Sequence, residues 1–283
     1  MTPLLHYSHT PLLAYWTHDL NPVLFHIWGP MAVRWYGVAY LLGFLGGYLI
    51  LKRLAKRGEF AVPEEELGNF IVHLAIFGVF LGGRLGYVLF YARDLFFQDP
   101  LFAFRVWEGG MASHGGILGV LAVVGWYAWK KKMPFWNLTD GLALVAPIGL
   151  FFGRIANFVN GELWGRPTQV AWGVIFPQAG DAVPTPRHPS QLYEALGEGL
   201  LLFIALWAVR KTAWGKREGS VSVLFLLIYA AARIASEFFR TPDAGYDLYL
   251  GWITKGQLFS SFMIVGAIAI FVAKKLYRPC KAE

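Results

Sequence analysis

The sequence predicts an all-α integral membrane protein with seven transmembrane helices. Hydrophobic residues make up 56% of its 283 positions, charged residues make up only 15%, and the mean hydropathy is +0.46. A soluble domain of this length does not need so apolar a composition to fill its core. Long apolar runs recur along the chain, and each can cross about 30 Å of hydrocarbon with about 20 helical residues. A transmembrane barrel would instead show short strands of alternating polarity.

The seven expected spans follow one another from the N-terminus, and the connections on one side are short. Each span is an apolar run with helical rather than alternating periodicity. The second span carries Gly78, Gly82 and Gly86 at four-residue intervals, which predicts a face for close helix packing. The expected spans are residues 33–51, 67–91, 111–129, 138–159, 189–209, 219–239 and 256–273.

Lysine and arginine are distributed unequally between the two sets of span ends. Of the 25 basic residues, fifteen lie at one set of ends, seven lie at the opposite ends and three lie inside spans. Because basic loops stay in the cytoplasm, we expect the N-terminus to be periplasmic and the C-terminus to be cytoplasmic. The net charge of +7 is then explained by anchoring to an anionic leaflet and not by nucleic-acid binding.

The segments outside the spans indicate a single membrane-embedded domain over residues 1–283, because no polar linker separates two cores. Residues 1–32 lack the pattern of a removable signal peptide and are expected to form an interfacial segment on the outer surface. The long connection 160–188 contains four prolines and an apolar patch, which predicts a small periplasmic subdomain. Cys280 is the only cysteine and lies in the basic tail, which excludes an intrachain disulfide.

Polar residues of the spans gather near the outer helix ends. An arginine in this environment costs several kcal/mol unless it is paired or serves a wet cavity. The depth of polar residues was not used to assign the spans, so their convergence predicts one polar cavity open to the outer leaflet. The contributors are Tyr36 from the first span, His114, Gly115 and Gly116 from the third, Arg154, Asn157 and Asn160 from the fourth, Gln191, Tyr193 and Glu194 from the fifth, and Tyr229, Arg233 and Glu237, with Arg240, on one face of the sixth.

A purely structural explanation of the charges is also available. The three arginines inside spans could neutralise three glutamates as buried ion pairs between helices. This explanation accounts for the charges but not for amides, a histidine and tyrosines at the same depth, although Arg84 and Glu198 are its best candidates. The groups concerned are Arg84, Arg154 and Arg233 on one side and Glu194, Glu198 and Glu237 on the other.

The predicted chemistry follows from arginine at the level of the lipid headgroups. Guanidinium is planar, stays protonated and matches a phosphate with two parallel hydrogen bonds. If the bond between a lipid phosphate and glycerol breaks, negative charge grows on the departing phosphate, and fixed guanidinium groups stabilise it without a metal or cofactor. His114 is the candidate general base, because a neutral imidazole accepts a proton from a thiol or hydroxyl near pH 7.

The segment GRIANFVNGELWG, residues 153–165, resembles the signature of bacterial prolipoprotein diacylglyceryl transferases and agrees with it at every signature position. Three further blocks are similar to the same family. These are SHGG at 113–116, HPSQLYE at 188–194 and RIASEFFR at 233–240.

The resemblance implies a seven-helix enzyme of the bacterial inner membrane with its active site toward the periplasmic leaflet. Such an enzyme transfers the diacylglyceryl group of phosphatidylglycerol to the lipobox cysteine thiol of a prolipoprotein signal peptide, and it releases glycerol phosphate. The implied roles are phosphate binding for Arg154 and Arg233, shaping of the headgroup site for Asn157, Asn160, Glu162 and Gly165, catalysis or positioning for His114 and Tyr36, and support of Arg233 for Glu237.

A transporter or flippase for an anionic lipid or metabolite is the alternative function. It would use the arginines to bind the anion without breaking a bond. Transporters show inverted repeats and broken helices near the midplane. The sequence shows no convincing internal repeat, and its polar residues gather toward one side of the membrane, which favours the transferase.

Overall fold

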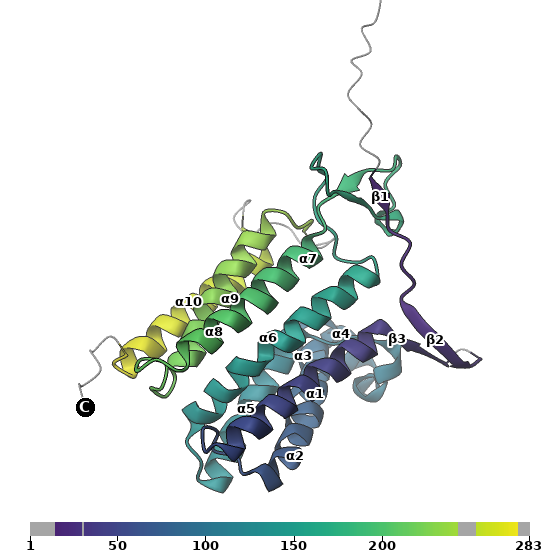
Figure 1. Ribbon diagram of the computed structural model, residues 1–283. Helices are drawn as coiled ribbons and strands as arrows, with labels where there is room; N and C mark the ends of the chain where they lie inside the picture. The colour runs from purple at the N-terminus through teal and green to yellow at the C-terminus, as the bar shows by residue number, and fades with distance from the viewer. Residues whose placement is uncertain (1–14, 30, 243–252, 277–283) are drawn as a thin grey trace, which may run out of the picture.

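The computed structural model describes residues 15–29, 31–242 and 253–276, so residues 1–14 of the expected interfacial segment and Cys280 lie outside the described residues. Figure 1 shows a bundle of long helices with short strands near one end. The helices are α1 (Trp35–Lys56), α2 (Glu64–His73), α3 (Gly82–Tyr91), α4 (Arg93–Gln98), α5 (Ser113–Lys131), α6 (Phe135–Val159), α7 (Ser190–Glu194), α8 (Leu202–Val209), α9 (Ser220–Glu237) and α10 (Lys255–Ala273).

Two of the spans change their helical form along their length. A π-helical segment, η1 (Leu74–Leu81), joins α2 to α3, and a second one, η5 (Ala195–Leu201), joins α7 to α8. Such wide turns recur at functional sites. Three short 3₁₀ turns lie outside the spans, η2 (Pro100–Phe104), η3 (Val106–Glu108) and η4 (Pro177–Ala179).

Helix α6 lies at the centre of the bundle. It contacts α1 and α5 on one side and α7, η5, α8 and α9 on the other. Figure 1 shows it between the α1–α5 part of the bundle and the α7–α10 part. Residues at the C-terminal end of α6 therefore lie next to both halves.

Six helices among the described residues are long and apolar enough to cross a membrane, and they correspond to six of the seven expected spans. The remaining expected span, 111–129, is also a helix, α5, with 19 residues. It is not among the six because a histidine, four glycines and two terminal lysines lower its mean hydropathy. The six are Trp35–Lys56, Glu64–Tyr91, Phe135–Val159, Ser190–Val209, Ser220–Glu237 and Gly256–Ala273.

The described residues are mostly helical, as expected, but outside the spans they also contain five short strands in two sheets. The first sheet has the order β1-β4-β5, with β1 (Trp16–Thr17) parallel to β4 (Val174–Ile175) and β4 antiparallel to β5 (Pro186–Arg187). We call this sheet with the loop 160–188 the head. The second sheet pairs β2 (Val23–Trp28) with β3 (Met31–Arg34). Extended backbone outside the bundle satisfies its N–H and C=O groups by this pairing.

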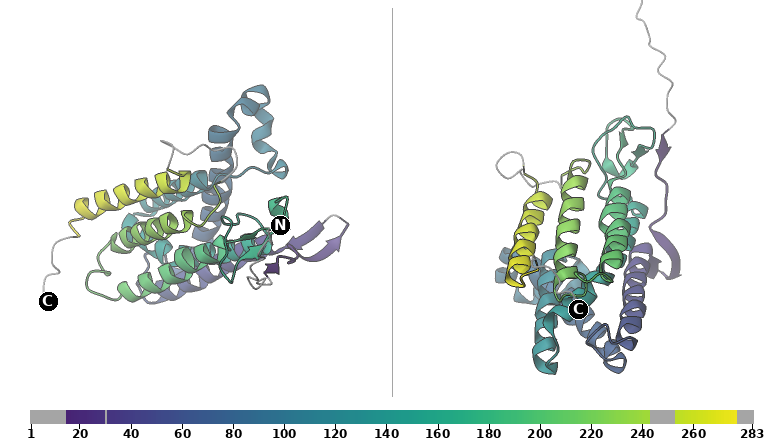
Figure 2. Two further views of the ribbon diagram at one scale, coloured as in Figure 1. Left: turned by 90° about the horizontal axis from the view of Figure 1, so that it is seen from above. Right: turned by 60° about the vertical axis from the view of Figure 1, so that its left-hand side comes forward.

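The N-terminal segment divides into two parts with different surroundings. His18 is buried beneath the head, where its Nε2 lies 2.7 Å from the carbonyl oxygen of Phe158 and its ring packs edge-on against the Phe158 ring. The whole segment was expected on the surface, and among its described residues this is wrong for His18 alone, because Trp16 and Thr17 of β1 stay exposed while β1 pairs with β4. The β2–β3 hairpin projects from the bundle (Figure 2), and Trp28 near its tip is 83% exposed.

The expected small-residue face of the second span is confirmed. A Cβ atom at Gly82 would lie 2.7 Å from the carbonyl oxygen of Gly115, and one at Gly86 would lie 2.5 Å from the Gly115 Cα. At Gly78 the nearest atom is the Cα of Val120, at 3.0 Å. The backbones of α5 and of the second span therefore touch, as small residues at a helix interface permit.

Asp140 joins α6 to the start of α9. Its Oδ2 accepts the backbone N–H of Gly219 at 2.7 Å, and its Oδ1 accepts the N–H of Ser222 at 2.7 Å and its hydroxyl at 2.6 Å. The first N–H groups of a helix have no partner within the helix, so this carboxylate caps α9 from a neighbouring helix.

We predict that Asp140→Ala lowers the free energy of unfolding by about 1–2 kcal/mol, because it removes an acceptor for helix-terminal N–H groups. Thermal unfolding of the purified protein in detergent measures this loss. Asp19→Ala is the control, since Asp19 is exposed and its replacement removes the same charge. Equal unfolding temperatures for the two variants would contradict the capping role.

Candidate active site

Six charged side chains from different segments meet at the end of the bundle nearest the head. Helix α6 contributes one arginine, α7 and η5 contribute two glutamates, α9 contributes an arginine and a glutamate, and one arginine follows α9. We call them the Arg–Glu cluster, which consists of Arg154, Glu194, Glu198, Arg233, Glu237 and Arg240.

Glu194 is the centre of the cluster. Its side chain is 0% exposed, and it contacts three guanidinium groups. The carboxylate lies 3.1 Å from Nη1 of Arg154, 2.6 Å from Nη1 of Arg233 and 3.2 Å from Nη1 of Arg240. Arg154 and Arg233, which come from α6 and α9, are therefore brought to one carboxylate.

The other two glutamates hold the same arginines from different sides. Glu198 Oε2 accepts Nε and Nη2 of Arg154 at 3.2 and 2.9 Å. Glu237 pairs with Nη2 of Arg233 one helical turn away, which confirms the expected i, i+4 support. Three arginines oppose three glutamates, so the buried charges are balanced as a buried cluster requires.

The side chains of Arg154 and Arg233 nevertheless remain partly accessible. Arg154 is 16% exposed and Arg233 is 14% exposed, whereas Glu194 and Glu198 are fully buried. Guanidinium has five N–H donors, and the contacts of Arg154 with Glu198 use one hydrogen on Nε and one on Nη2. The carboxylates thus fix the direction of the guanidinium groups, and part of each guanidinium side chain stays accessible.

Arg84 does not join this cluster, so the proposed structural pairing of all three intramembrane arginines was wrong for it. Its guanidinium instead binds backbone carbonyl oxygens of the loop that follows α4, and the Arg84 side chain lies over the Phe102 ring at 4.8 Å. Charge on arginine is compensated here by peptide dipoles, which hold the loop against α3. The carbonyls belong to Phe102, Ala103, Arg105, Gly109 and Gly110.

The amides of the 153–165 segment form a second group with α1. Asn157 Nδ2 donates to Tyr36 Oη and, at 2.9 Å, to Glu162 Oε1. Asn160 Nδ2 lies 3.5 Å from the same Glu162 oxygen, and Gln191 Nε2 donates to the Glu162 carbonyl oxygen at 2.6 Å. The structure therefore brings Tyr36 to the signature segment, as the common depth of these residues predicted.

Gly165 has a backbone role in this arrangement. A Cβ atom there would lie 2.5 Å from the carbonyl oxygens of both His188 and Phe239, so only glycine fits. Gly165 bridges to Arg240, and the N–H of Arg166 donates to the Phe239 carbonyl oxygen at 2.8 Å. This backbone pairing joins the loop after α6 to the chain after α9, and it holds Arg240 beside Glu194.

Tyr193 links the head to α7. Trp172 Nε1 donates to Tyr193 Oη at 2.7 Å, and that hydroxyl lies 3.2 Å from His188 Nδ1. Burial lowers the pKa of His188, which favours the neutral imidazole, and a neutral imidazole can accept a hydrogen bond from the Tyr193 hydroxyl. These contacts direct Tyr193 to the head, whereas its neighbour Glu194 points to the arginines.

His114 contacts α10, and α10 also lies close to Arg233 of the cluster. Its ring lies against Phe259, with 4.0 Å between the ring centroids. One turn earlier on α10, a Cβ atom at Gly256 would lie 3.0 Å from Nη2 of Arg233. His114 and Arg233 therefore contact consecutive turns of the same helix face.

Two further expected residues pack against their helical neighbours. Tyr229 stacks on Phe225, with 5.8 Å between ring centroids, one turn before Arg233. Gly115 was expected in the polar cavity, but a Cβ atom there would lie 2.6 Å from the Gly86 Cα, so its backbone packs against the second span. The space that this glycine provides is therefore occupied by the neighbouring helix.

Three members of the site were missed or undervalued from the sequence. Glu198 was considered only in the structural explanation of the charges, and the structure shows that it binds Arg154. Arg240 was placed on the correct helix face but not counted as a site residue. Gly256 gave no sequence signal, because only the packing of α10 against α9 reveals its proximity to the Arg233–Glu237 pair.

Comparisons with known proteins decide the family. A family model described as prolipoprotein diacylglyceryl transferase matches residues 22–273. The chain belongs to the prolipoprotein diacylglyceryl transferase family. Membership makes it a membrane transferase of lipoprotein maturation, which confirms the activity that the signature segment implied.

Relatives named phosphatidylglycerol–prolipoprotein diacylglyceryl transferase align over nearly the whole chain. The relative from Idiomarina loihiensis is 48% identical over 267 residues, which cover 94% of this chain and 97% of the relative. The one from Pseudoalteromonas atlantica is 46% identical over 258 residues, covering 90% and 89%, respectively. The one from Vibrio vulnificus is 47% identical over 253 residues, covering 89% and 90%.

We predict that Glu194→Ala lowers the free energy of unfolding by about 3–5 kcal/mol, because it leaves buried guanidinium groups without their shared carboxylate. Unfolding in detergent, followed by far-ultraviolet circular dichroism, measures this loss. Glu218→Ala is the control, since Glu218 is half exposed and lies 3.7 Å from its partner Lys274. A similarly small effect in both variants would show that Glu194 does not hold the cluster together.

Proposed function

We propose that the chain transfers the diacylglyceryl group of phosphatidylglycerol to the cysteine thiol of a prolipoprotein signal peptide at the Arg–Glu cluster. The observation that carries this proposal is the contact of Arg154 and Arg233 with one buried carboxylate, which brings two partly accessible guanidinium groups from separate helices together. A phosphate held by both would lie at the side of the cluster that faces away from Glu194.

The reaction exchanges one bond for another. The thiol sulfur attacks the glyceryl carbon that carries the phosphate, a carbon–sulfur bond forms, and the carbon–oxygen bond to the phosphate breaks. Glycerol phosphate leaves with the electron pair, and the thiol proton passes to a base. A thiol with a pKa of about 8.5 is only a few per cent ionised at pH 7, so removal of its proton assists the attack.

The arginines assist the departure of the phosphate. Negative charge increases on its oxygens as the carbon–oxygen bond breaks, and guanidinium groups already fixed by Glu194, Glu198 and Glu237 need no reorganisation to stabilise it. The glutamates are fully buried and the two arginines mostly buried, and such surroundings strengthen this interaction. The glutamates thus act as positioning residues, and Arg154 and Arg233 act as the phosphate ligands.

The amide group beside the cluster suits the uncharged part of the headgroup. Asn157, Asn160 and Glu162 offer donors and acceptors for the two glycerol hydroxyls, with Tyr36 and Gln191 completing the wall. We assign His114 as the base that accepts the thiol proton. Tyr229, one turn before Arg233, is assigned to the lining of the headgroup site. Tyr193, Gly115 and Gly165 are assigned structural roles, because they hold neighbouring segments together.

The proposed topology has seven spans in one domain of the bacterial inner membrane. They are the six apolar helices described above and α5, which is the third span in chain order. The N-terminus and the head are periplasmic, and the C-terminus is cytoplasmic. The distribution of basic residues supports this orientation, because their clusters follow α1, α5, α8 and α10 at the end opposite the head. The Arg–Glu cluster then faces the periplasmic leaflet, where a signal peptide and a lipid both arrive.

We predict that Arg154→Lys and Arg233→Lys each lower turnover by about 10²–10³-fold, because an ammonium group cannot form the paired hydrogen bonds to a transition-state phosphate. The assay measures glycerol phosphate released from phosphatidylglycerol and a lipobox peptide in detergent. Arg105→Lys is the control, since Arg105 pairs with Asp99 and Glu108 outside the cluster. Lipid binding without any release, even in the unsubstituted protein, would favour the transporter.

We predict that His114→Gln lowers turnover by about 10²-fold at pH 7, as loss of a general base does. The deficit should shrink as the pH rises through the thiol pKa of about 8.5, because the acceptor then ionises by itself. His73→Gln is the control, since His73 lies near the N-terminal end of the second span and contacts the Asn69 carbonyl oxygen there. A deficit that is independent of pH would assign His114 to substrate positioning instead.

A further inference from the structure

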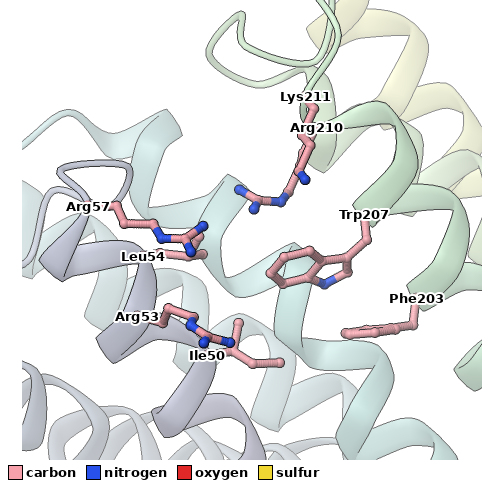
Figure 3. Close-up of a pocket in the computed structure, with 8 residues that line it drawn as sticks. All are labelled: Ile50, Arg53, Leu54, Arg57, Phe203, Trp207, Arg210 and Lys211. Carbon is pink, nitrogen blue, oxygen red and sulfur yellow. The ribbon is translucent and has the colours of Figure 1, made fainter.

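A concave surface lies at the end of the bundle opposite the Arg–Glu cluster. It is a cavity of about 390 Å³ between the C-terminal turn of α1 and the C-terminal end of α8. Figure 3 shows α6 behind the opening. We call this cavity the inner groove. None of its residues takes part in the contacts of the Arg–Glu cluster.

Four of the eight residues that line the inner groove are cationic. They are Arg53, Arg57, Arg210 and Lys211, and in the described part of the chain only Arg210 among them has a carboxylate partner, the half-exposed Glu59. Among the described residues, Arg53 and Arg57 form no ion pair. In Figure 3 the guanidinium groups of Arg53, Arg57 and Arg210 all point into the space between the two helices. Like charges that face one another in this way favour an anion between them.

Two buried N–H groups in the groove have no acceptor. The side chain of Arg210 is 9% exposed and lies over the Trp207 ring at 4.1 Å. Its Nε and the Nε1 of Trp207 are both buried without a hydrogen-bond partner in the described part of the chain. Buried donors are almost always paired in folded proteins, so the packing of Arg210 on Trp207 leaves this part of α8 with unsatisfied polar atoms next to the groove.

The walls of the groove are apolar and belong to membrane-spanning helices. Ile50 and Leu54 come from α1, and Phe203 and Trp207 come from the end of the fifth expected span. A soluble anion would need the cations but not these walls. A phospholipid needs both, because its phosphate lies at the interface and the upper part of its acyl chains lies in hydrocarbon.

We propose that the inner groove binds the phosphate of an anionic phospholipid from the leaflet opposite the Arg–Glu cluster. Arg53 and Arg57 contact the phosphate from α1, Arg210 and Lys211 contact it from the end of α8, and the acyl chains lie along Ile50, Leu54 and Phe203. This lipid is bound and not consumed, so the site is independent of the transfer reaction. In the proposed orientation the lipid belongs to the cytoplasmic leaflet.

The test measures binding of phosphatidic acid to the full-length protein in detergent by native mass spectrometry. Arg53→Gln/Arg57→Gln removes two exposed cations of the groove, and Lys132→Gln/Lys216→Gln removes two exposed cations at the same end outside it. We expect the groove variant to bind about tenfold more weakly and the control variant to bind like the unsubstituted protein. Equal weakening of both variants would reduce the effect to general surface charge and overturn the proposal.

Further arms separate the sources of the phosphate and the two sites. Phosphatidylcholine and inorganic phosphate should not compete with phosphatidic acid, and competition by inorganic phosphate at equal concentration would show an anion site without lipid specificity. Arg154→Lys should retain the binding that the groove variant loses. Loss of binding in Arg154→Lys alone would place the lipid at the Arg–Glu cluster and contradict the proposal. Glycerol phosphate release by the groove variant reports separately on the transfer reaction.

Discussion

The site depends on the ion pairs that the buried carboxylate of Glu194 forms. This carboxylate forms ion pairs with guanidinium groups from α6, from α9 and from the chain after α9, so three segments that are distant in sequence must meet there. A buried charge is costly unless it is paired, and this one can be paired only when all three segments are in place. The same requirement that stabilises the bundle end therefore fixes the direction of the two arginines assigned to the phosphate.

Close backbone contacts make this convergence possible. Gly165 lets the loop after α6 pass between the carbonyl oxygens of His188 and Phe239, which brings Arg240 beside Glu194. Gly256 lets α10 approach the Arg233–Glu237 pair, and Phe259 on its next turn contacts His114. Glycine at these positions serves the approach of one segment to another, and the chemistry belongs to the side chains around it.

The two ends of the bundle treat charge in opposite ways. In the Arg–Glu cluster each arginine has a carboxylate, and the ligand must use the donors that these pairs leave. At the inner groove, Arg53 and Arg57 have no ion pair among the described residues, and the donors of Arg210 and Trp207 lack acceptors. The first arrangement suits transient binding of a group that departs, whereas the second suits a lipid that stays. Both follow from where arginine lies relative to glutamate and not from arginine content.

The sequence alone determined four properties of this protein. Hydropathy determined the membrane class and the helical spans, glycine spacing determined the packing face of Gly82 and Gly86, and the signature segment determined the family. Each of these depends on local periodicity or on contiguous residues. The shared depth of Arg154, Arg233 and Tyr36 also predicted their common end of the bundle. Only the tertiary structure decided which charges pair. Arg84 binds carbonyl oxygens, Glu198 binds Arg154, and β1 joins a strand more than 150 residues away, since such partners are chosen by packing between segments and leave no local pattern.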